Sequence, residues 1–368
     1  MMQIPWSNPW LDTAEKEELV KTFDSTWVSM GPRVMKFESK MQEYIGVKHA
    51  IAVSNGTVAL DLALKSLGVG PQDEVIVPAM TYVATVSSVL YQNAMPVFAD
   101  IELDTFNIDP FSIEKLISKK TKCIIYIDYG GNPADQINLQ RISRKYKIPL
   151  LQDGAQSLGG EFRDEKLCKQ GLVCTTSFHV AKNMTTIEGG MIFTESDKIA
   201  SDIRMMRNQG EDPKEKYIHR VLGTNARLTD LQAAIGLKQI EKLDFILKKR
   251  AQIAESYYSE FRATDKIRLP IIRKDAKNAW FFVPILLKNR DKVAVELNKL
   301  GISTRIAYPM PVYEQPFFSK YRDKKQKFNC VNAKLMTQRV LNLPIFYTMT
   351  DGQVRYVIKN VLSSVNKY

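Results

Sequence analysis

The chain has 368 residues, of which 45% are hydrophobic and 25% are charged, and this composition excludes a disordered or collagen-like protein. Lysine and arginine number 52 against 40 acidic residues, and the net charge of +12 favours an anionic partner. The basic residues are scattered, and the densest stretch, residues 320–327, has no interleaved base-stacking pattern. We expect a solvated helix face or loop there and no nucleic-acid binding.

The four cysteines form no C-x-x-C pair, and the chain has only three histidines. We therefore expect neither a disulfide framework nor a metal site, and the cysteine usage suits a reducing cytoplasm. The N-terminus lacks the basic-then-apolar layout of a signal peptide, and no run of 18 apolar residues follows. These features predict a cytoplasmic protein that does not span a membrane.

Short apolar, β-branched runs alternate with helix-like stretches through the first two-thirds of the chain. The predicted strands are residues 49–54, 74–78, 96–100, 123–128, 149–153, 176–180 and 191–194, and residues 56–67 are a typical predicted helix. Several of the strands are almost continuously apolar, as in parallel strands covered on both faces. The alternation predicts an α/β domain with a mostly parallel sheet.

Residues 228–261 carry apolar residues at helical spacing and predict one or two long amphipathic helices. Fewer and shorter strands follow, at residues 281–287 and 301–306. We therefore predict a large domain over residues 1–244 and a smaller α+β domain over residues 245–368.

Two motifs follow predicted strands. Ser54-Asn55-Gly56-Thr57 opens a helix, where free backbone N–H groups would suit an anion, although a plain strand-to-helix turn has the same pattern. Asp153, at the end of a strand, could keep a heteroaromatic nitrogen protonated or could simply cap the next turn. The chain has neither a P-loop nor a dinucleotide-binding fingerprint in a suitable setting.

Two further motifs lie downstream. Lys182 stands between apolar segments in SFHVAKNMTTIEGG, residues 177–190, where it is either an ordinary solvated lysine or an amine that forms a Schiff base with an aldehyde. His179 in the same run suits a packing role. Residues 223–230, GTNARLTD, offer an amide and a guanidinium suited to phosphate, or else a helix-capping loop.

Together these stretches resemble the sugar aminotransferases of the DegT/DnrJ/EryC/StrS type, which are pyridoxal-phosphate enzymes of the aspartate-aminotransferase fold (fold type I). The resemblance runs almost from end to end, and its longest matches are VKHAIAVSNGTVALDLAL, GPQDEVIVPAMTYVATVSSVLYQNAMPVFADI, DGAQSLGG, SFHVAKNMTTIEGG, MRNQGED, GTNARLTDLQAAIG and GISTRIAYPMPVYEQPFF.

The resemblance implies a role for each matching residue. Lys182 would form the Schiff base with the cofactor and shuttle the proton, Asp153 would face the pyridine nitrogen, and Gln156 would lie near the ring hydroxyl. Tyr82 would stack on the ring. The phosphate would be held by Gly56, Thr57 and Ser177, and by Asn225 from the neighbouring subunit. The implied substrate-binding residues are Trp27, Ser29, Arg227, Arg305 and Tyr308.

The resemblance also implies amino transfer from L-glutamate to a keto group of a nucleotide-linked deoxysugar, by a homodimer with shared active sites. Relatives that aminate carbon 3 resemble SFYPxKNLGAxGDGG, whereas those that aminate carbon 4, the perosamine-synthase-like group, resemble SFHxxKNxTTxEGG. This chain follows the second pattern. The expected product is a 4-amino-4,6-dideoxyhexose nucleotide for a surface glycan such as lipopolysaccharide O-antigen. The chain departs from the family at Thr224, Ala226 and Ala307, in two loops that the resemblance places near the bound sugar nucleotide.

Alternative functions remain open. A 3-keto sugar aminotransferase or a pyridoxal-phosphate-dependent sugar dehydratase would keep the same fold, but the dehydratases replace the Schiff-base lysine with histidine. A regulatory protein that senses the cofactor should carry an added DNA-binding region, and a polyanion-binding protein is supported by charge alone.

Overall fold

The computed structural model describes residues 2–321 and 328–368. The basic stretch at residues 320–327 lies outside the described residues apart from Lys320 and Tyr321, so the expectation for it stays a prediction. Across the described residues, no helix combines the length and the apolar character needed to cross a bilayer.

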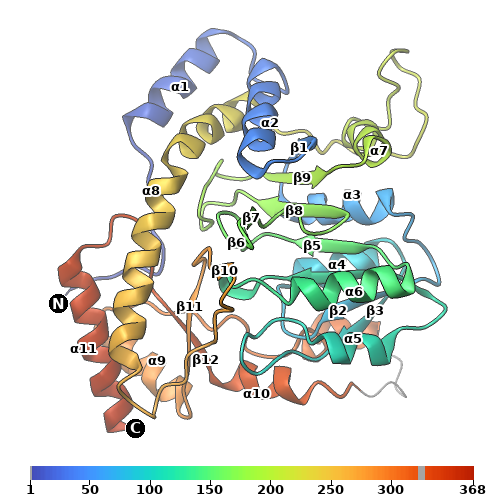
Figure 1. The fold of residues 1–368 in the computed structure, drawn as a ribbon. Helices are drawn as coiled ribbons and strands as arrows, with labels where there is room; N and C mark the ends of the chain where they lie inside the picture. The colour runs from blue at the N-terminus through green and yellow to red at the C-terminus, as the bar shows by residue number, and fades with distance from the viewer. Residues whose placement is uncertain (1, 322–327) are drawn as a thin grey trace.

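A seven-stranded sheet forms the centre of the structure (Figure 1). In spatial order its strands are β1 (His49–Val53), β9 (Gly190–Thr194), β8 (Val173–Ser177), β5 (Leu150–Asp153), β4 (Thr121–Ile127), β2 (Glu74–Pro78) and β3 (Met95–Ala99). All neighbouring strands from β8 to β3 are parallel, whereas β9 is antiparallel to both β8 and β1. The predicted mostly parallel sheet is confirmed.

Helices cover both faces of this sheet, which is why residues on both sides of the strands are apolar. On one face lie α3 (Gly56–Ser66), α4 (Val83–Tyr91) and α7 (Asp197–Arg207), packed on side chains such as Val77 and Ile125. The other face is covered by α5 (Pro110–Leu116), α6 (Gln136–Tyr146), α2 (Pro32–Ile45) and the first turns of α8 (Asp230–Phe261).

The long helix α8 leads from this face into the C-terminal part of the chain (Figure 1). There a two-stranded sheet of β11 (Val283–Leu286) and β12 (Val340–Leu343) packs with α9 (Arg290–Lys299) and α11 (Asp351–Lys367) around a separate apolar cluster. The remaining elements are α1 (Thr13–Asp24), α10 (Val331–Arg339), β6 (Glu161–Phe162), β7 (Glu165–Lys166), β10 (Ala276–Lys277), η1 (Tyr129–Gly131), η2 (Val312–Glu314) and η3 (Pro316–Lys320).

Several contacts cross the predicted division between residues 244 and 245. The division falls inside α8, which is one continuous helix of 32 residues. Val312 and Phe318 pack in the same cluster as Phe98 of β3, and Ile4 near the N-terminus joins the C-terminal cluster. The position of the domain boundary therefore stays a prediction.

Two predicted strands differ from the structure. The strand predicted at residues 176–180 is β8, which ends at Ser177, because the chain leaves the sheet there. Residues 301–306 form no strand. Ile302 and Arg305 make only isolated bridges, to Ile4 and to Asn342 of β12, because the chain between them does not continue either pairing.

Candidate active site

A cavity of about 870 Å³ opens at the edge of the sheet where β5 and β8 end and α3 begins. Ligands of open α/β sheets bind at the carboxyl ends of the strands, so this edge is the expected place for a site. The structure brings together most of the residues predicted from the sequence, since the cavity is lined by Gly56, Thr57, Tyr82, Asp153, Gln156, Ser177, Lys182, Arg305 and Tyr308.

Lys182 and Asp153 are a pair of opposite charges within this cavity. Burial lowers the pKa of Lys182 from 10.5 to about 8, and the charge of Asp153 opposes part of that change. Burial also raises the pKa of Asp153, while Thr85, Ala155 and Lys182 act in the opposite direction. A buried carboxylate of this kind stabilises a cation placed beside it.

The carboxylate of Asp153 is held in place by its neighbours. The hydroxyl of Thr85 in α4 donates to Asp153 Oδ2 at 2.6 Å, and the backbone N–H of Ala155 donates to Oδ1 at 3.2 Å. Thr81 Oγ1 lies 2.8 Å from Thr85 Oγ1 and fixes the rotamer of that donor. Asp153 is therefore oriented by a side chain of α4 and by a backbone N–H, and it is only 5% exposed.

The N-terminus of α3 packs closely against the end of β8. Asn55 caps the helix, accepting from the N–H of Val58 at 2.9 Å, so the helix begins at Gly56. A Cβ on Gly56 would lie 2.9 Å from Ser177 Cβ. The glycine thus lets the free N–H groups of the first helical turn approach the hydroxyl of Ser177, an arrangement suited to a phosphate.

Gln156 joins the wall of the cavity to the loop after β4. Its Oε1 accepts from the N–H of Gly130 at 2.7 Å, and its Nε2 donates to the hydroxyl of Tyr308 at 3.2 Å. The ring of Tyr82 lies 6.1 Å from that of Tyr308. These contacts set the positions of both tyrosines relative to the sheet edge.

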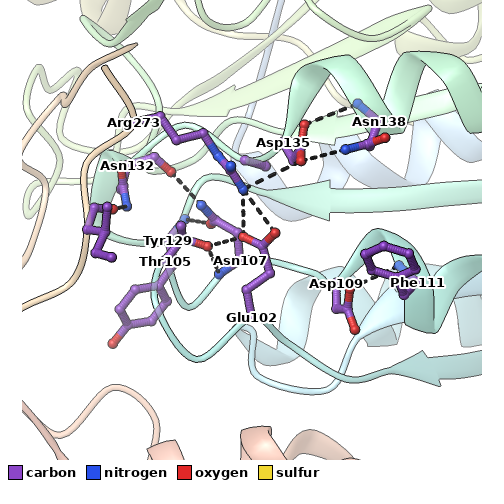
Figure 2. A network of polar contacts seen from close by, with 12 residues as sticks. Glu102, Thr105, Asn107, Asp109, Phe111, Tyr129, Asn132, Asp135, Asn138 and Arg273 are labelled. Carbon is purple, nitrogen blue, oxygen red and sulfur yellow. Dashed lines mark hydrogen bonds and ion pairs between the residues drawn. The ribbon is translucent and has the colours of Figure 1, made fainter. Parts of the chain in front are cut away.

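Figure 2 shows the polar network that fixes the loop carrying Gly130. Asn107 accepts from the N–H of Tyr129 at 2.7 Å and donates to the carbonyl of Asn132 at 2.9 Å. Arg273, from the segment after α8, forms an ion pair with Glu102 at 2.8 Å (Figure 2). Asn132 in this loop donates through Nδ2 to the carbonyl of Ile271, also in the segment after α8, at 2.9 Å, so the loop is tied to both parts of the chain.

Four predicted residues lie outside the lining of this cavity. Asn225 is exposed and pairs through its backbone with Asn208, whose side chain accepts from Arg227 at 2.6 Å. Trp27 is exposed and donates to the carbonyl of Met30, and Ser29 accepts from the N–H of Asp230 at 2.8 Å. Within one chain these four residues do not meet Lys182, so their predicted roles stay predictions.

The structure adds residues that the sequence did not reveal. Trp6, Phe281 and Phe282 line the cavity, and Thr85 supports Asp153. Trp6 comes from the N-terminal segment and the two phenylalanines from the segment before β11, so no local pattern connects them with Lys182. His179, for which a packing role was predicted, lines the cavity, with Nε2 3.7 Å from Glu188 Oε1.

Comparison with protein families places these features in a wider group. The profile of the DegT/DnrJ/EryC1/StrS aminotransferase family matches residues 9–362, nearly the whole chain. The match therefore includes every element that lines the cavity apart from the segment that carries Trp6.

Three relatives illustrate the group. GDP-perosamine synthase of Caulobacter vibrioides is 35% identical and covers 97% of this chain and 96% of its own length. UDP-2-acetamido-2-deoxy-3-oxo-D-glucuronate aminotransferase of Pseudomonas aeruginosa is 34% identical and covers 89% of each chain. The solved PLP form of the putative sugar aminotransferase Spr1654 of Streptococcus pneumoniae is 26% identical, with a TM-score of 0.94, and covers 100% of this chain and 99% of its own.

Proposed function

The chain belongs to the DegT/DnrJ/EryC1/StrS aminotransferase family, the pyridoxal-phosphate-dependent sugar aminotransferases, and we propose that it transfers the amino group of L-glutamate to a nucleotide-linked 4-keto-6-deoxyhexose. The product would be a 4-amino-4,6-dideoxyhexose nucleotide for a surface glycan such as lipopolysaccharide O-antigen. The observation that carries the proposal is the placement of Lys182 beside Asp153 in one cavity at the edge of the sheet.

The residues of this cavity fit pyridoxal phosphate. Lys182 supplies the amine for the aldehyde, and Asp153 supplies a buried anion for the ring nitrogen. The close approach of Gly56 to Ser177 brings the free N–H groups at the start of α3 near a hydroxyl, and together these donors suit a phosphate. The bound cofactor supplies an electron sink, and the chain positions and tunes it. The fit rests on side chains from β5, β8, α3 and the loop after β8.

Lys182 also suits the transfer of a proton. With a pKa of about 8, a substantial fraction of its amine is neutral near pH 7–8, whereas an ordinary lysine is almost fully charged there. A group whose pKa lies near the working pH both accepts and returns a proton efficiently. We assign this step to Lys182 Nζ and the orientation of the ring to Asp153 and Gln156.

Arg305 is suited to an anionic group of the substrate. Its guanidinium lies 5.4 Å from the ring centre of Trp6 and donates to the carbonyl of Thr304 at 3.2 Å. Because Arg305 lines the cavity, its charge faces the space that the two substrates use in turn. The guanidinium of Arg305 can form charge-assisted hydrogen bonds both with a carboxylate of glutamate and with the diphosphate of a nucleotide sugar.

Two observations support amination at carbon 4. The chain has the SFHxxKNxTTxEGG pattern of the 4-amino group, with His179 and Glu188 in the cavity wall, and GDP-perosamine synthase is among its relatives. The relative named as an aminotransferase of a 3-oxo sugar favours amination at carbon 3 as a second candidate. We further propose a cytoplasmic homodimer in which Asn225 completes the neighbouring site.

A screen of keto sugars tests the proposal. Protein loaded with pyridoxal phosphate is given L-glutamate and, in turn, 4-keto-6-deoxy and 3-keto hexoses linked to UDP, GDP or dTDP, and 2-oxoglutarate is measured. We expect turnover with a 4-keto sugar, nitrogen on carbon 4 by product NMR, and no turnover in Lys182→Ala. Turnover with 3-keto sugars alone would establish the second candidate instead.

A further inference from the structure

The segment of residues 279–282 is a braced turn that lies against the lysine loop. The N–H of Ala279 donates to the carbonyl of Gly131 at 2.9 Å, and the N–H of Phe282 donates to that of Gly130 at 3.2 Å. Asn183, next to Lys182, donates to the carbonyl of Ala279 at 2.9 Å. The turn is therefore tied to the loop after β4 and to the lysine loop.

The backbone of this turn needs such support. Trp280 has φ 51°, in the left-handed region that costs a residue with a side chain of order 1 kcal/mol. The side chain of Asn278 accepts from the N–H of Trp280 at 2.7 Å and stabilises this conformation locally. A conformation of this kind persists only where the surroundings determine it.

The strongest support comes from Arg250 of α8. Its guanidinium donates to the carbonyls of Trp280 at 2.8 Å, of Phe281 at 2.9 Å and of Ile345 at 3.0 Å, and the residue is 5% exposed. All three of these acceptors are backbone carbonyls. Arginine presents its donors in a rigid fork, so it fixes the two successive carbonyls of the turn together.

The turn carries Phe281 directly over the amine of the active-site lysine. Lys182 Nζ lies 4.3 Å from the centre of the Phe281 ring, and that ring is itself buried against Phe282, with ring centres 4.4 Å apart. We propose that Arg250 is a positioning residue for amino transfer, which holds Phe281 over Lys182 Nζ and so excludes water from one side of the amine.

Two opposing effects of the ring have to be compared. A ring face attracts an ammonium ion by about 0.5–1 kcal/mol at exposed sites, which favours the charged lysine. Removal of water disfavours the charged lysine by up to several pKa units at buried sites. Because burial is the largest cause of the lowered pKa of Lys182, we expect the exclusion of water to dominate.

Other charges also face this amine. The charge that acts on Lys182 most strongly is that of Asp153, from β5. The cavity is further lined by the titratable side chains of Tyr82, His179, Glu188, Arg305 and Tyr308. Phe281→Leu and Arg250→Lys leave all of these side chains unchanged in identity, so the two variants address the ring and its support separately from them.

The test uses the cofactor-free protein and needs no sugar substrate, so its failure is distinct from a failure of the proposed function. A short pulse of acetic anhydride is applied over a range of pH, and acetylation of Lys182 is read by peptide mass spectrometry. The exposed Lys198 serves as an internal reference. In Phe281→Leu and in Arg250→Lys, we expect the pH midpoint for Lys182 to rise by about one unit, a tenfold change in reactivity at fixed pH.

Arg290 provides a matched control. It is also a buried arginine that donates to two backbone carbonyls, those of Thr337 and Val340, but it lies in α9 and does not line the cavity. Arg290→Lys should leave the midpoint of Lys182 unchanged.

The proposal is overturned if Phe281→Leu leaves the midpoint unchanged, or if folded Arg250→Lys leaves it unchanged while Phe281→Leu raises it. If Arg250→Lys does not fold, Phe281→Leu and Trp280→Gly, which relieves the left-handed position, decide by the same measurement.

Discussion

At the scale of single residues, Lys182 combines a chemical advantage with a cost to stability. The folded chain places an amine among Asp153, Phe281 and the cavity wall, where its charged form is disfavoured and its neutral form is available. An unfolded chain imposes no such constraint, so the lysine prefers the unfolded state while it carries a proton. Functional groups with strongly shifted pKa values commonly oppose folding in this way.

We predict that Lys182→Met stabilises the cofactor-free protein at pH 7. The folded pKa of about 8 lies below the ordinary value of 10.5, so between these pH values the folded state binds fewer protons than the unfolded state. The stability of the wild type should therefore rise with pH through this window, and the advantage of Lys182→Met should shrink. Because Lys182 is partly exposed to water in the cavity, we expect an advantage of about 1–3 kcal/mol at pH 7.

Denaturant unfolding at pH 7 and pH 10.5 checks this prediction. The exposed Lys198 of α7, replaced in the same way by methionine, is the matched control and should show little difference at either pH. Equal stability of Lys182→Met and the wild type at pH 7 would show that the lysine is not destabilised by its surroundings.

At the scale of the elements, the site depends on how closely α3 approaches β8. The contact requires a residue without a side chain at the first position of the helix, because Ser177 at the end of β8 occupies the adjacent space. The approach aligns two kinds of donor, backbone N–H and hydroxyl, toward the same point. Displacing the helix would separate them without unfolding either element.

Gly56→Ala tests this contact. Its Cβ would lie 2.9 Å from Ser177 Cβ, so α3 or β8 must shift. We expect the affinity for pyridoxal phosphate, measured by absorbance titration, to fall about tenfold, or ~1.4 kcal/mol, while the affinity for pyridoxal, which lacks the phosphate, changes little. Gly352→Ala, whose Cβ would meet nothing nearer than 3.8 Å, is the control. An equal loss for both ligands would place the phosphate elsewhere.

The sequence predicted these elements well where their signals are local. The strands β2 and β5 are short, almost continuous apolar runs, and the helix after Asn55 has a capping residue at its start. The apolar residues after Ser177 also suit a strand, yet the chain leaves the sheet there. The contacts that make residues 178–186 a loop, such as that between Thr186 N–H and the Phe178 carbonyl, are not visible in the residue pattern.

At the scale of the whole molecule, the cavity is assembled from distant parts of the chain. Trp6 comes from the N-terminal segment, Asp153 from β5, Lys182 from the loop after β8, and Arg305 from the C-terminal part. Thr85 and Phe281 belong to this set only because of the fold, which explains why the motifs identified Lys182 and Asp153 but neither of their supports. Family resemblance supplied the roles of single residues, and tertiary structure supplies their neighbours.

Asn225 presents the remaining question at this scale. The backbone bridge to Asn208 and the hydrogen bond from Arg227 to the Asn208 side chain fix its segment. Asn225 itself is exposed and does not line the cavity of its own chain. This placement suits a contact with a site on another chain, as in the proposed dimer with shared sites.

We predict that two inactive variants restore activity when they share a dimer. Lys182→Ala removes the amine, and Asn225→Ala should remove a phosphate contact. If Asn225 serves the neighbouring site, a hybrid dimer has one site with both defects and one intact site. The isolated hybrid should then have roughly half of wild-type activity, and an unseparated random mixture roughly a quarter. If Asn225 serves its own chain, every site in the hybrid keeps one defect and no activity returns.

Coexpression of the two variants with different affinity tags, followed by isolation of doubly tagged dimers, separates these outcomes. A pair of Lys182→Ala and Lys182→Met chains is the inactive control.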